Sequence, residues 1–230
     1  MAEARAAVLV TRPEPDAAET AAVLVSMGWQ PVIAPLLKVQ TLPLAPVRCD
    51  AVLLTSGNAL PALVGVGRDV PVLAVGDRTA ARARAAGFLV VHSADGDAAA
   101  LMGLVAGFCA PGAALLLPCG AGQGGALAAE LRAAGYRVFR RRAYRAAPVR
   151  LFPAAAQDGF TVGAIGSTLL LSALTAEVFA RLLPPALHGA LRTVDALVIG
   201  PPAAHAVAHL PWRRVRVSAK PTLERVLALL

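Results

Sequence analysis

The stretch AVLVTRPEPDAAETAAVLVSMGWQPVIA, residues 7–34, decides the fold class. It opens with the apolar run Ala7–Val10, which is typical of a strand buried on both faces of a parallel sheet. An alanine-rich helix is expected at residues 16–27, with Gly28 placed to end it. Pro31–Ala34 is the next expected strand. A strand, a helix and a second strand in so short a stretch predict an α/β fold built on a parallel sheet.

The same alternation continues along the rest of the sequence. Further strands are expected at residues 50–54, 71–75, 88–91, 113–117, 136–144, 168–171, 195–199 and 215–217, and further helices at residues 80–86, 126–134 and 175–183, after Pro202 and after Thr222. Two segments break the alternation, because Leu36–Leu44 and Arg140–Pro148 are extended, bounded by prolines and without a helix beside them. We expect these two segments to pair as a two-strand ladder that joins two lobes.

A chain of 230 residues is long enough for two small domains with separate cores. Pairing of the two extended segments would make the first domain discontinuous. The predicted organisation is a first domain of residues 1–36 and 149–230, a second domain of residues 44–141, and a connecting ladder of residues 37–43 and 142–148.

The two halves of the sequence share a pattern. Leu53–Leu63 resembles Leu170–Ala176, and each is followed by a strand that ends in glycine, at Gly76 and Gly200. Either this pattern is one that α/β proteins have in common, or the chain contains two homologous lobes. In the second case, the turns at the carboxyl ends of strands line one cleft between the lobes, since ligands bind there in open α/β sheets. Those turns follow Leu54, Val75, Leu171 and Ile199.

The composition is basic and poor in aromatic residues. The formal charge is +8, and all the basic residues except Lys38 and Lys220 are arginine. Arginine usage of this kind fits a GC-rich genome, a nucleic-acid partner, or a polyanionic small molecule whose carboxylates pair with the guanidinium fork. A nucleic-acid surface needs aromatic residues among the basic ones, and the densest basic stretch, Arg137–Arg145, places its aromatics in an expected strand. We expect no nucleic-acid partner.

Cysteine and histidine spacing gives no metal site. The three cysteines share no paired spacing, and with no secretory pattern at the N-terminus we expect reduced thiols in a cytoplasmic protein. His205 and His209 have the i, i+4 spacing of zinc ligands, but no third ligand stands near them, so a solvated helix face is expected. The uncharged stretch 159–176 is long enough for a membrane span, yet its glycines and hydroxyl residues favour a helix end followed by a buried strand.

The loop Gly120–Gly125 fits the GxGxxG pattern of a dinucleotide site after a strand. The expected carboxylate about 20 residues on is replaced by Arg140–Arg142, which would favour a phosphorylated cofactor such as NADP. The alternative is a flexible glycine turn. No nucleophile elbow or Ser/His/Asp order supports a hydrolase.

Several residues are candidates for a site at the strand ends. Arg12 is either a surface arginine or an anion ligand beside a helix start. Ser56, Asn58 and Thr79 fit helix caps, a role that does not exclude contact with a ligand. Tyr144 is either a packed strand aromatic or a proton donor in a cleft.

Motifs along essentially the whole chain resemble those of the uroporphyrinogen-III synthases in their order and spacing. They are Thr11-Arg12-Pro13, Thr55-Ser56-Gly57-Asn58, Ala74 to Ala80 with Gly87, Gly135-Tyr136-Arg137-Val138, Ala143-Tyr144-Arg145, Ser172, Ile199-Gly200-Pro201 and Pro221-Thr222. The sequence departs from the family at Pro202 and Ala203, where members carry a threonine, and at Ala173, where members carry a proline.

The resemblance implies two flavodoxin-like parallel-sheet lobes joined by a two-strand ladder, in a cytoplasmic, monomeric lyase without metal or cofactor. The implied reaction cyclises hydroxymethylbilane, a substrate that closes unaided to the wrong isomer, with loss of water and inversion of ring D through a spiro intermediate to uroporphyrinogen III in haem biosynthesis. Its implied proton donor is Tyr144. Its implied substrate-binding residues are Arg12, Ser56, Gly57, Asn58, Gly76, Thr79, Ser172, Gly200 and Pro201.

Two alternatives stay open from the sequence. One is an NADP-dependent reductase that uses the Gly120–Gly125 loop. The other is a catalytically silent tetrapyrrole-binding module of the same fold, made conceivable by the missing threonine after Pro201.

Overall fold

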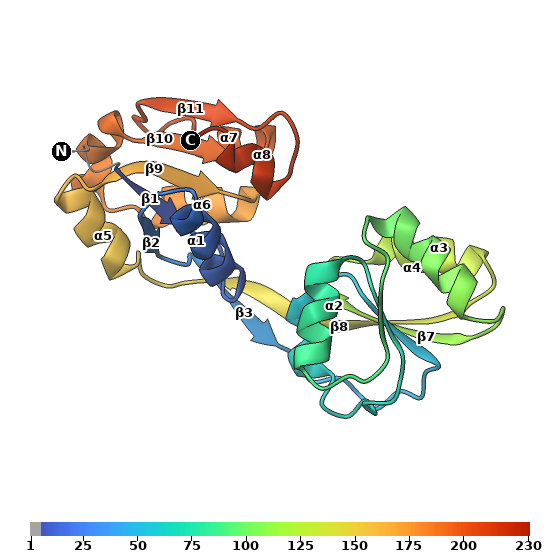
Figure 1. Cartoon of the computed structure of the whole chain (residues 1–230). Helices are drawn as coiled ribbons and strands as arrows, with labels where there is room; N and C mark the ends of the chain where they lie inside the picture. Colours follow the sequence, from blue (N-terminus) through green and yellow to red (C-terminus); the bar gives the residue numbers. More distant parts are fainter. Residues whose placement is uncertain (1–5) are drawn as a thin grey trace. The chain divides into compact units, whose positions relative to one another are not determined.

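The computed structural model describes residues 6–230 (Figure 1). Residues 1–5, where no secretory pattern was expected, lie outside this range. The chain divides into two compact units, one of Met1–Lys38 with Ala147–Leu230 and one of Val39–Ala146. Each unit is built around one sheet, and helices cover both faces of each sheet. The expected α/β class with two parallel-dominated sheets is confirmed.

The first unit contains a five-stranded sheet in which every pair is parallel. Along the sheet the order is β2-β1-β9-β10-β11. Numbered within the unit this is 2-1-3-4-5, the flavodoxin-like order, which changes direction between β1 and β9. The strands are β1 (Ala7–Val10), β2 (Pro31–Ile33), β9 (Ile165–Leu170), β10 (Asp195–Val198) and β11 (Arg214–Val217).

Alternation along the strands supplies a core on each face of this sheet. Val8 and Val10 point to the face that α1 and α8 cover, and Leu9 points to the opposite face. Full burial on both sides explains why β1 is apolar at every position. The first face carries α1 (Asp16–Ser26) and α8 (Leu223–Leu227), and the second carries α5 (Ala154–Thr161), α6 (Ala173–Leu182), η2 (Pro185–Thr193) and α7 (Pro201–Val207).

The second unit contains a six-stranded sheet in the order β3-β8-β7-β4-β5-β6. The pairs from β8 to β6 are parallel, and β3 adds an antiparallel edge, shown by bonds from Leu42 N to Ala143 O (2.8 Å) and from Val149 N to Leu36 O (3.0 Å). The strands are β3 (Leu37–Thr41), β4 (Ala51–Leu54), β5 (Val72–Ala74), β6 (Val91–Ser93), β7 (Ala114–Gly120) and β8 (Arg137–Pro148).

Helices again cover both faces of this second sheet. On one face Val52, Leu54 and Tyr144 pack beneath η1 (Gly57–Ala62) and α2 (Asp77–Ala85). On the other face Leu53 and Leu115 pack beneath α3 (Ala98–Phe108) and α4 (Gly125–Ala133). The direction of the order changes between β4 and β7 in this unit.

The two sheets share one spatial plan in a permuted chain order. The order β2-β1-β9-β10-β11 corresponds strand by strand to β8-β7-β4-β5-β6. Under this correspondence the turn after β9 matches the turn after β4, and Gly200 after β10 matches Gly76 after β5. The similar sequences Leu53–Leu63 and Leu170–Ala176 therefore occupy equivalent places, as the two-lobe reading of the repeat expects.

One strand lies later in the sequence than expected. A strand was expected at residues 88–91, whereas β6 begins at Val91. The reason is that Phe88 N donates to Ala83 O (3.2 Å) across Gly87, whose φ is +90°, so Phe88 closes the end of α2. Phe88 is buried but Leu89 is 78% exposed, whereas a strand in the middle of the sheet would bury both side chains.

The long uncharged stretch folds as the sequence predicts. Within residues 159–176, α5 ends at Thr161, β9 follows, and α6 begins at Ala173. Within the described chain, residues 6–230, no helix combines the length and the hydropathy needed to cross a membrane.

Candidate active site

The carboxyl ends of the first sheet lie along one edge, because all its strands are parallel. Ligands of open α/β sheets bind at this edge where the strand order changes direction. Thr11, which is fully buried after β1, donates its hydroxyl proton to Leu169 O (2.5 Å) and ties β1 to β9 at that place. Four of the expected site residues follow strands at this edge, namely Arg12, Ser172, Gly200 and Pro201.

Arg12 lies against the first turns of α1. Its Nη2 is 2.8 Å from Asp16 Oδ2, and its Nη1 donates to Thr20 Oγ1 at 3.1 Å. The side chain is 17% exposed. An anion that binds Arg12 therefore competes with the Asp16 carboxylate, which makes Arg12 a weaker anion ligand than its position in the sequence indicates.

Ser172 forms the N-cap of α6. Its Oγ accepts from Thr175 N (3.0 Å) and shares a hydrogen bond with Thr175 Oγ1 (2.7 Å). The hydroxyl is only partly buried, so it fixes the helix start while it faces the carboxyl edge. Capping and contact with a ligand are compatible at this position.

The turn at Gly200 offers few hydrogen-bond donors. Gly200 has an extended backbone with φ of 177°, and Pro201 and Pro202 occupy the first positions of α7. Proline has no backbone N–H, so the start of this short helix lacks two donors. The equivalent turn of the second sheet, after Gly76, begins α2 with Asp77, Arg78 and Thr79, all of which carry N–H groups.

The second sheet places Ser56, Gly57 and Asn58 directly after β4. Ser56 caps η1 through a bond from Asn58 N to its Oγ (3.3 Å), as the capping alternative expected. Gly57 lies under the Arg82 side chain, and a Cβ at Gly57 would be 2.6 Å from Arg82 Cδ. Arg82 belongs to α2, so a side chain at residue 57 would require the Arg82 side chain to move.

Gly76 and Thr79 follow β5, the neighbour of β4. Gly76 is the N-cap of α2, so Thr79 lies in the first turn and is not a cap. The Thr79 side chain is 9% exposed, and within residues 6–230 its hydroxyl has no hydrogen bond. The structure thus brings together five of the expected site residues on two neighbouring strand ends, Ser56, Gly57, Asn58, Gly76 and Thr79.

Tyr144 lies on β8, beside the end of β7. It is paired in register with Gly120 and is 7% exposed. Its phenol donates to Gln123 Oε1 at 3.1 Å. A Cβ at Gly120 would lie 2.6 Å from Gln123 Oε1 and 3.0 Å from the Tyr144 ring, so only glycine there admits both side chains.

The glycine loop after β7 holds Gln123. Gly122 and Gly124 have φ of +78° and +75°, which favour glycine, and they turn the chain around Gln123. Cys119 Sγ (3.2 Å) and Arg140 Nη1 (3.0 Å) both donate to Gln123 O. Gln123 is not among the residues that the sequence predicts, because its partner Tyr144 is 21 residues away on the next strand.

No metal site or activated thiol lies among the described residues. Within residues 6–230 no group of three or more His, Cys, Asp or Glu side chains is placed to hold a metal ion. His205 and His209 are both exposed. Burial raises the pKa of the Cys119 thiol, although Arg140 acts to lower it, so the neutral thiol is favoured.

A family comparison identifies the chain. The family model described as Uroporphyrinogen-III synthase HemD matches residues 18–228. The chain belongs to the uroporphyrinogen-III synthase family. The match includes every strand of both sheets except β1, so the resemblance drawn from the sequence is confirmed. No curated protein sequence matches the chain significantly.

The Helicobacter pylori synthetase shares the fold of this chain, and two Thermus thermophilus synthase structures are more weakly similar. The chain is 17% identical to uroporphyrinogen-III synthetase from Helicobacter pylori 26695, with a TM-score of 0.61 and coverage of 98% of this chain and 97% of that one. It is 21% identical to a mutant uroporphyrinogen III synthase from Thermus thermophilus, with a TM-score of 0.46 and coverage of 98% and 100%. A second Thermus thermophilus synthase gives 21% identity, a TM-score of 0.43 and coverage of 96% and 97%.

Membership of the synthase family settles the class of reaction. The chain is an enzyme of tetrapyrrole biosynthesis, a cyclising hydro-lyase. The NADP-dependent reductase and the catalytically silent module are not favoured. The structure gives the Gly120–Gly125 loop another role, since the Gln123 side chain fills the space beside Gly120.

Proposed function

We propose that this synthase binds hydroxymethylbilane, expels its terminal hydroxyl as water, and closes the macrocycle with ring D inverted to give uroporphyrinogen III. The observation that carries the proposal is the family match over residues 18–228, which includes every strand of both sheets except β1. Because the substrate closes unaided to the wrong isomer, the enzyme has to select a conformer more than lower a high chemical barrier. Positioning of reacting groups is the main source of catalysis in this case.

The proposed proton donor is Tyr144. Loss of the substrate hydroxyl as water requires one proton, and the Tyr144 phenol carries a proton already directed at an acceptor, Gln123 Oε1. A proton passed from the phenol to the hydroxyl leaves a phenolate. The proton released from ring D when its pyrrole regains aromaticity restores the phenol, so the reaction conserves protons.

The proposed contacts to acetate and propionate groups come from the strand-end turns. In the second unit they are the hydroxyl or amide groups of Ser56, Asn58 and Thr79 and the backbone at Gly57 and Gly76. Thr79 supports this role most directly, since its hydroxyl is without a hydrogen bond in residues 6–230. In the first unit the proposed contacts are Arg12, Ser172, Gly200 and Pro201.

The charge of the chain supports an acidic substrate. Hydroxymethylbilane carries eight carboxylates, and the chain has a formal charge of +8. Electrostatic attraction of this kind raises the rate of encounter and weakens with salt. The proposal extends to a monomeric, cytoplasmic protein with two domains, residues 1–36 with 149–230 and residues 44–141, connected through residues 37–43 and 142–148.

A coupled assay tests the proposed function. Hydroxymethylbilane is generated in place, the protein is added, and the products are oxidised and separated as uroporphyrin isomers I and III. We expect isomer III to dominate with the protein and isomer I without it. Isomer I alone in the presence of folded protein would overturn the proposal. Light scattering of the same sample tests the monomer.

A further inference from the structure

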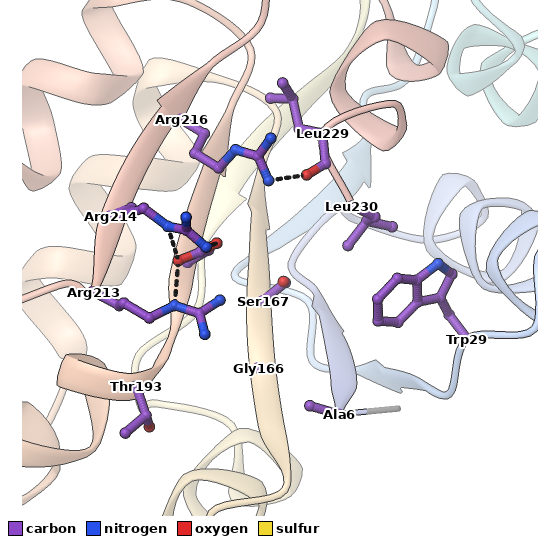
Figure 2. Close-up of a pocket in the computed structure, with 11 residues that line it drawn as sticks. Ala6, Trp29, Gly166, Ser167, Thr193, Arg213, Arg214, Arg216, Leu229 and Leu230 are labelled. Atoms are coloured by element: carbon purple, nitrogen blue, oxygen red, sulfur yellow. Dashed lines mark hydrogen bonds and ion pairs between the residues drawn. The ribbon is translucent and has the colours of Figure 1, made fainter. Parts of the chain in front are cut away.

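The first unit has a pocket at the amino ends of its strands. Its volume is about 270 Å³. Figure 2 shows Arg213, Arg214 and Arg216 on one side and Trp29 with Leu230 on the other. Ala6, Gly166 and Ser167 belong to the amino ends of β1 and β9, and Trp29 lies in the connection from α1 to β2. The proposed function uses none of these residues.

Ser167, Asp195 and Arg214 form a polar row at the floor of this pocket, next to Val8 of the core. Parallel pairing places Val8 beside Ser167, Ser167 beside Asp195, and Asp195 beside Arg214. The next row on the same face, two residues along each strand, contains Val10, Leu169 and Leu197 in the core beneath α1 and α8. The face is thus apolar where helices cover it and polar where the pocket opens.

Two of the three arginines in the pocket pair with one carboxylate, and the third binds a backbone carbonyl. Arg213 Nε is 2.7 Å from Asp195 Oδ1, and Arg214 Nη2 is 3.0 Å from Asp195 Oδ2. Asp195 is buried, and these two arginines satisfy it. Arg216 Nη1 donates to Leu229 O at the end of α8.

Donors remain after these bonds are counted. A guanidinium has five N–H groups, and within residues 6–230 the two Nη atoms of Arg213 and the Nε and Nη2 atoms of Arg216 have no hydrogen bond. The Ser167 hydroxyl likewise makes no hydrogen bond within the described residues, and Figure 2 shows it between the arginines and the apolar wall.

Among the described residues, the net charge of the pocket lining is positive. The three arginines Arg213, Arg214 and Arg216 and the single carboxylate of Asp195 give these side chains a net charge of +2. If the α-carboxylate of Leu230 is included, the net charge is +1. The opposite wall is apolar, formed by Trp29, Leu229 and Leu230, which are half-buried against the core of this face. A ligand that satisfies both walls has an anionic head and an apolar body.

We infer that this pocket binds a small organic carboxylate with an aromatic or branched apolar body. The carboxylate pairs with Arg213 and Arg216, whose forked donors match its planar geometry. The apolar body lies against Trp29 and Leu230. The volume of about 270 Å³ suits a ligand of one ring, and it is too small for a four-ring substrate.

This pocket is separate from the substrate-binding turns of the same unit. Ser167, on its floor, precedes Ser172 at the carboxyl edge by five residues along β9. At the rise of a β-strand this is about 17 Å. The inference does not depend on the proposed function, and its test reads binding without turnover.

Benzoate titration of ¹⁵N-labelled full-length protein tests the inference. The indole N–H resonance of Trp29, assigned with the Trp29→Phe variant, is expected to shift saturably with benzoate. Benzamide, which keeps the ring and removes the charge, is expected not to bind measurably. We expect Arg213→Gln and Arg216→Gln each to weaken benzoate binding at least about tenfold. Arg181→Gln, an exposed arginine on α6, is the matched control and keeps wild-type binding.

Three results overturn the inference. If benzoate gives no saturable shift, or if both pocket variants bind benzoate like the Arg181→Gln control, the arginines serve only Asp195 and Leu229. If benzamide binds as well as benzoate, the pocket recognises an apolar body and the anion assignment is wrong. Thermal unfolding of each variant confirms that the comparison is made on folded protein. The affinity of each arginine variant for benzoate is compared with wild type separately, so one variant still tests the inference if the other does not fold.

Discussion

The Tyr144 phenol donates a hydrogen bond to Gln123 Oε1 at 3.1 Å, across the end of the β7–β8 pair. Glycine at residue 120 makes this contact possible, since a side chain there would overlap Gln123 and crowd the tyrosine ring. The bond fixes the direction of the phenolic proton before substrate binds. The proposed proton donation by Tyr144 would then require only an exchange of acceptor.

We expect Tyr144→Phe to slow formation of isomer III by about tenfold without abolishing it. General acids commonly contribute about 10²–10⁴-fold, but here the substrate already loses its hydroxyl unaided, so a smaller effect is predicted. The measurement is kcat in the coupled assay. Gln123→Met, which keeps the length of the side chain and removes the amide, is expected to lower kcat less than Tyr144→Phe. A folded Tyr144→Phe protein without any activity would contradict catalysis by positioning.

Gly120→Ala is expected to reduce the fraction of isomer III more than any other substitution in the loop. The added methyl group would lie 2.6 Å from Gln123 Oε1, so Gln123 and Tyr144 have to move. Gly125→Ala is the matched control, because its Cβ would be 3.5 Å from Arg140 Nη1 and it lies at the start of α4. Equal isomer ratios for the two variants would show that the Tyr144–Gln123 pair does not contribute to selectivity.

Ser172→Ala is expected to lower stability and substrate affinity together. Loss of the cap of α6 costs about 1 kcal/mol of unfolding free energy, and the proposed carboxylate contact predicts a KM raised about threefold to tenfold, the value of one hydrogen bond. Asp97→Ala is the control, since Asp97 caps α3 through bonds to Ala99 N and Ala100 N and has no proposed contact with substrate. A KM raised equally by both variants would assign the effect to stability alone.

Much of the fold follows from local sequence, because buried parallel strands are short apolar runs. The runs at β1, β4 and β10 are apolar or nearly so and fully buried, and all three were predicted. The helix α3 was not expected. Its sequence AAALMGLVAGF contains Gly103 and Gly107, which lower helix propensity. Packing of Leu101 and Val105 on the sheet, four residues apart on one helix face, outweighs that propensity.

The contacts of the candidate site were predictable only where both partners lie in the same turn. Ser56 and its cap are local, so the sequence shows them. Gln123 contacts Tyr144 only because β7 pairs with β8. The pairing of Arg12 with Asp16 becomes evident only when the start of α1 is known. Contacts between strands depend on register, which a single sequence does not specify.

The Asp195 ion pair predicts a pH dependence of stability. The Arg213 guanidinium, helped by Arg214, holds the pKa of Asp195 below its ordinary value, although burial acts to raise it. A lowered folded-state pKa stabilises the fold above the unfolded value, about 3.9, and the benefit is lost as the pH falls through the folded-state value. Asp195→Asn is therefore expected to cost about 1–3 kcal/mol at pH 7, with the difference shrinking below about pH 4.

Denaturant unfolding of wild type and Asp195→Asn between about pH 2 and pH 7, a range set by ordinary carboxyl pKa values, measures this difference. Asp158→Asn, an exposed carboxylate on α5, is the control and is expected to change stability by less than about 0.5 kcal/mol. A constant difference between wild type and Asp195→Asn at every pH would show that the loss comes from packing and not from the charge.

Two buried threonines, one directly after β1 and one on β9, give the last prediction. Thr11 and Thr168 are both fully buried, but Thr11 donates to Leu169 O at 2.5 Å whereas Thr168 Oγ1 has no hydrogen-bond partner in residues 6–230. An unpaired buried hydroxyl costs free energy that an apolar group of the same shape avoids. We expect Thr168→Val to raise the unfolding free energy by about 1 kcal/mol and Thr11→Val to lower it by about 1–2 kcal/mol. Thermal unfolding of the two variants measures both changes, and a decrease in both would mean that the Thr168 hydroxyl is satisfied in solution.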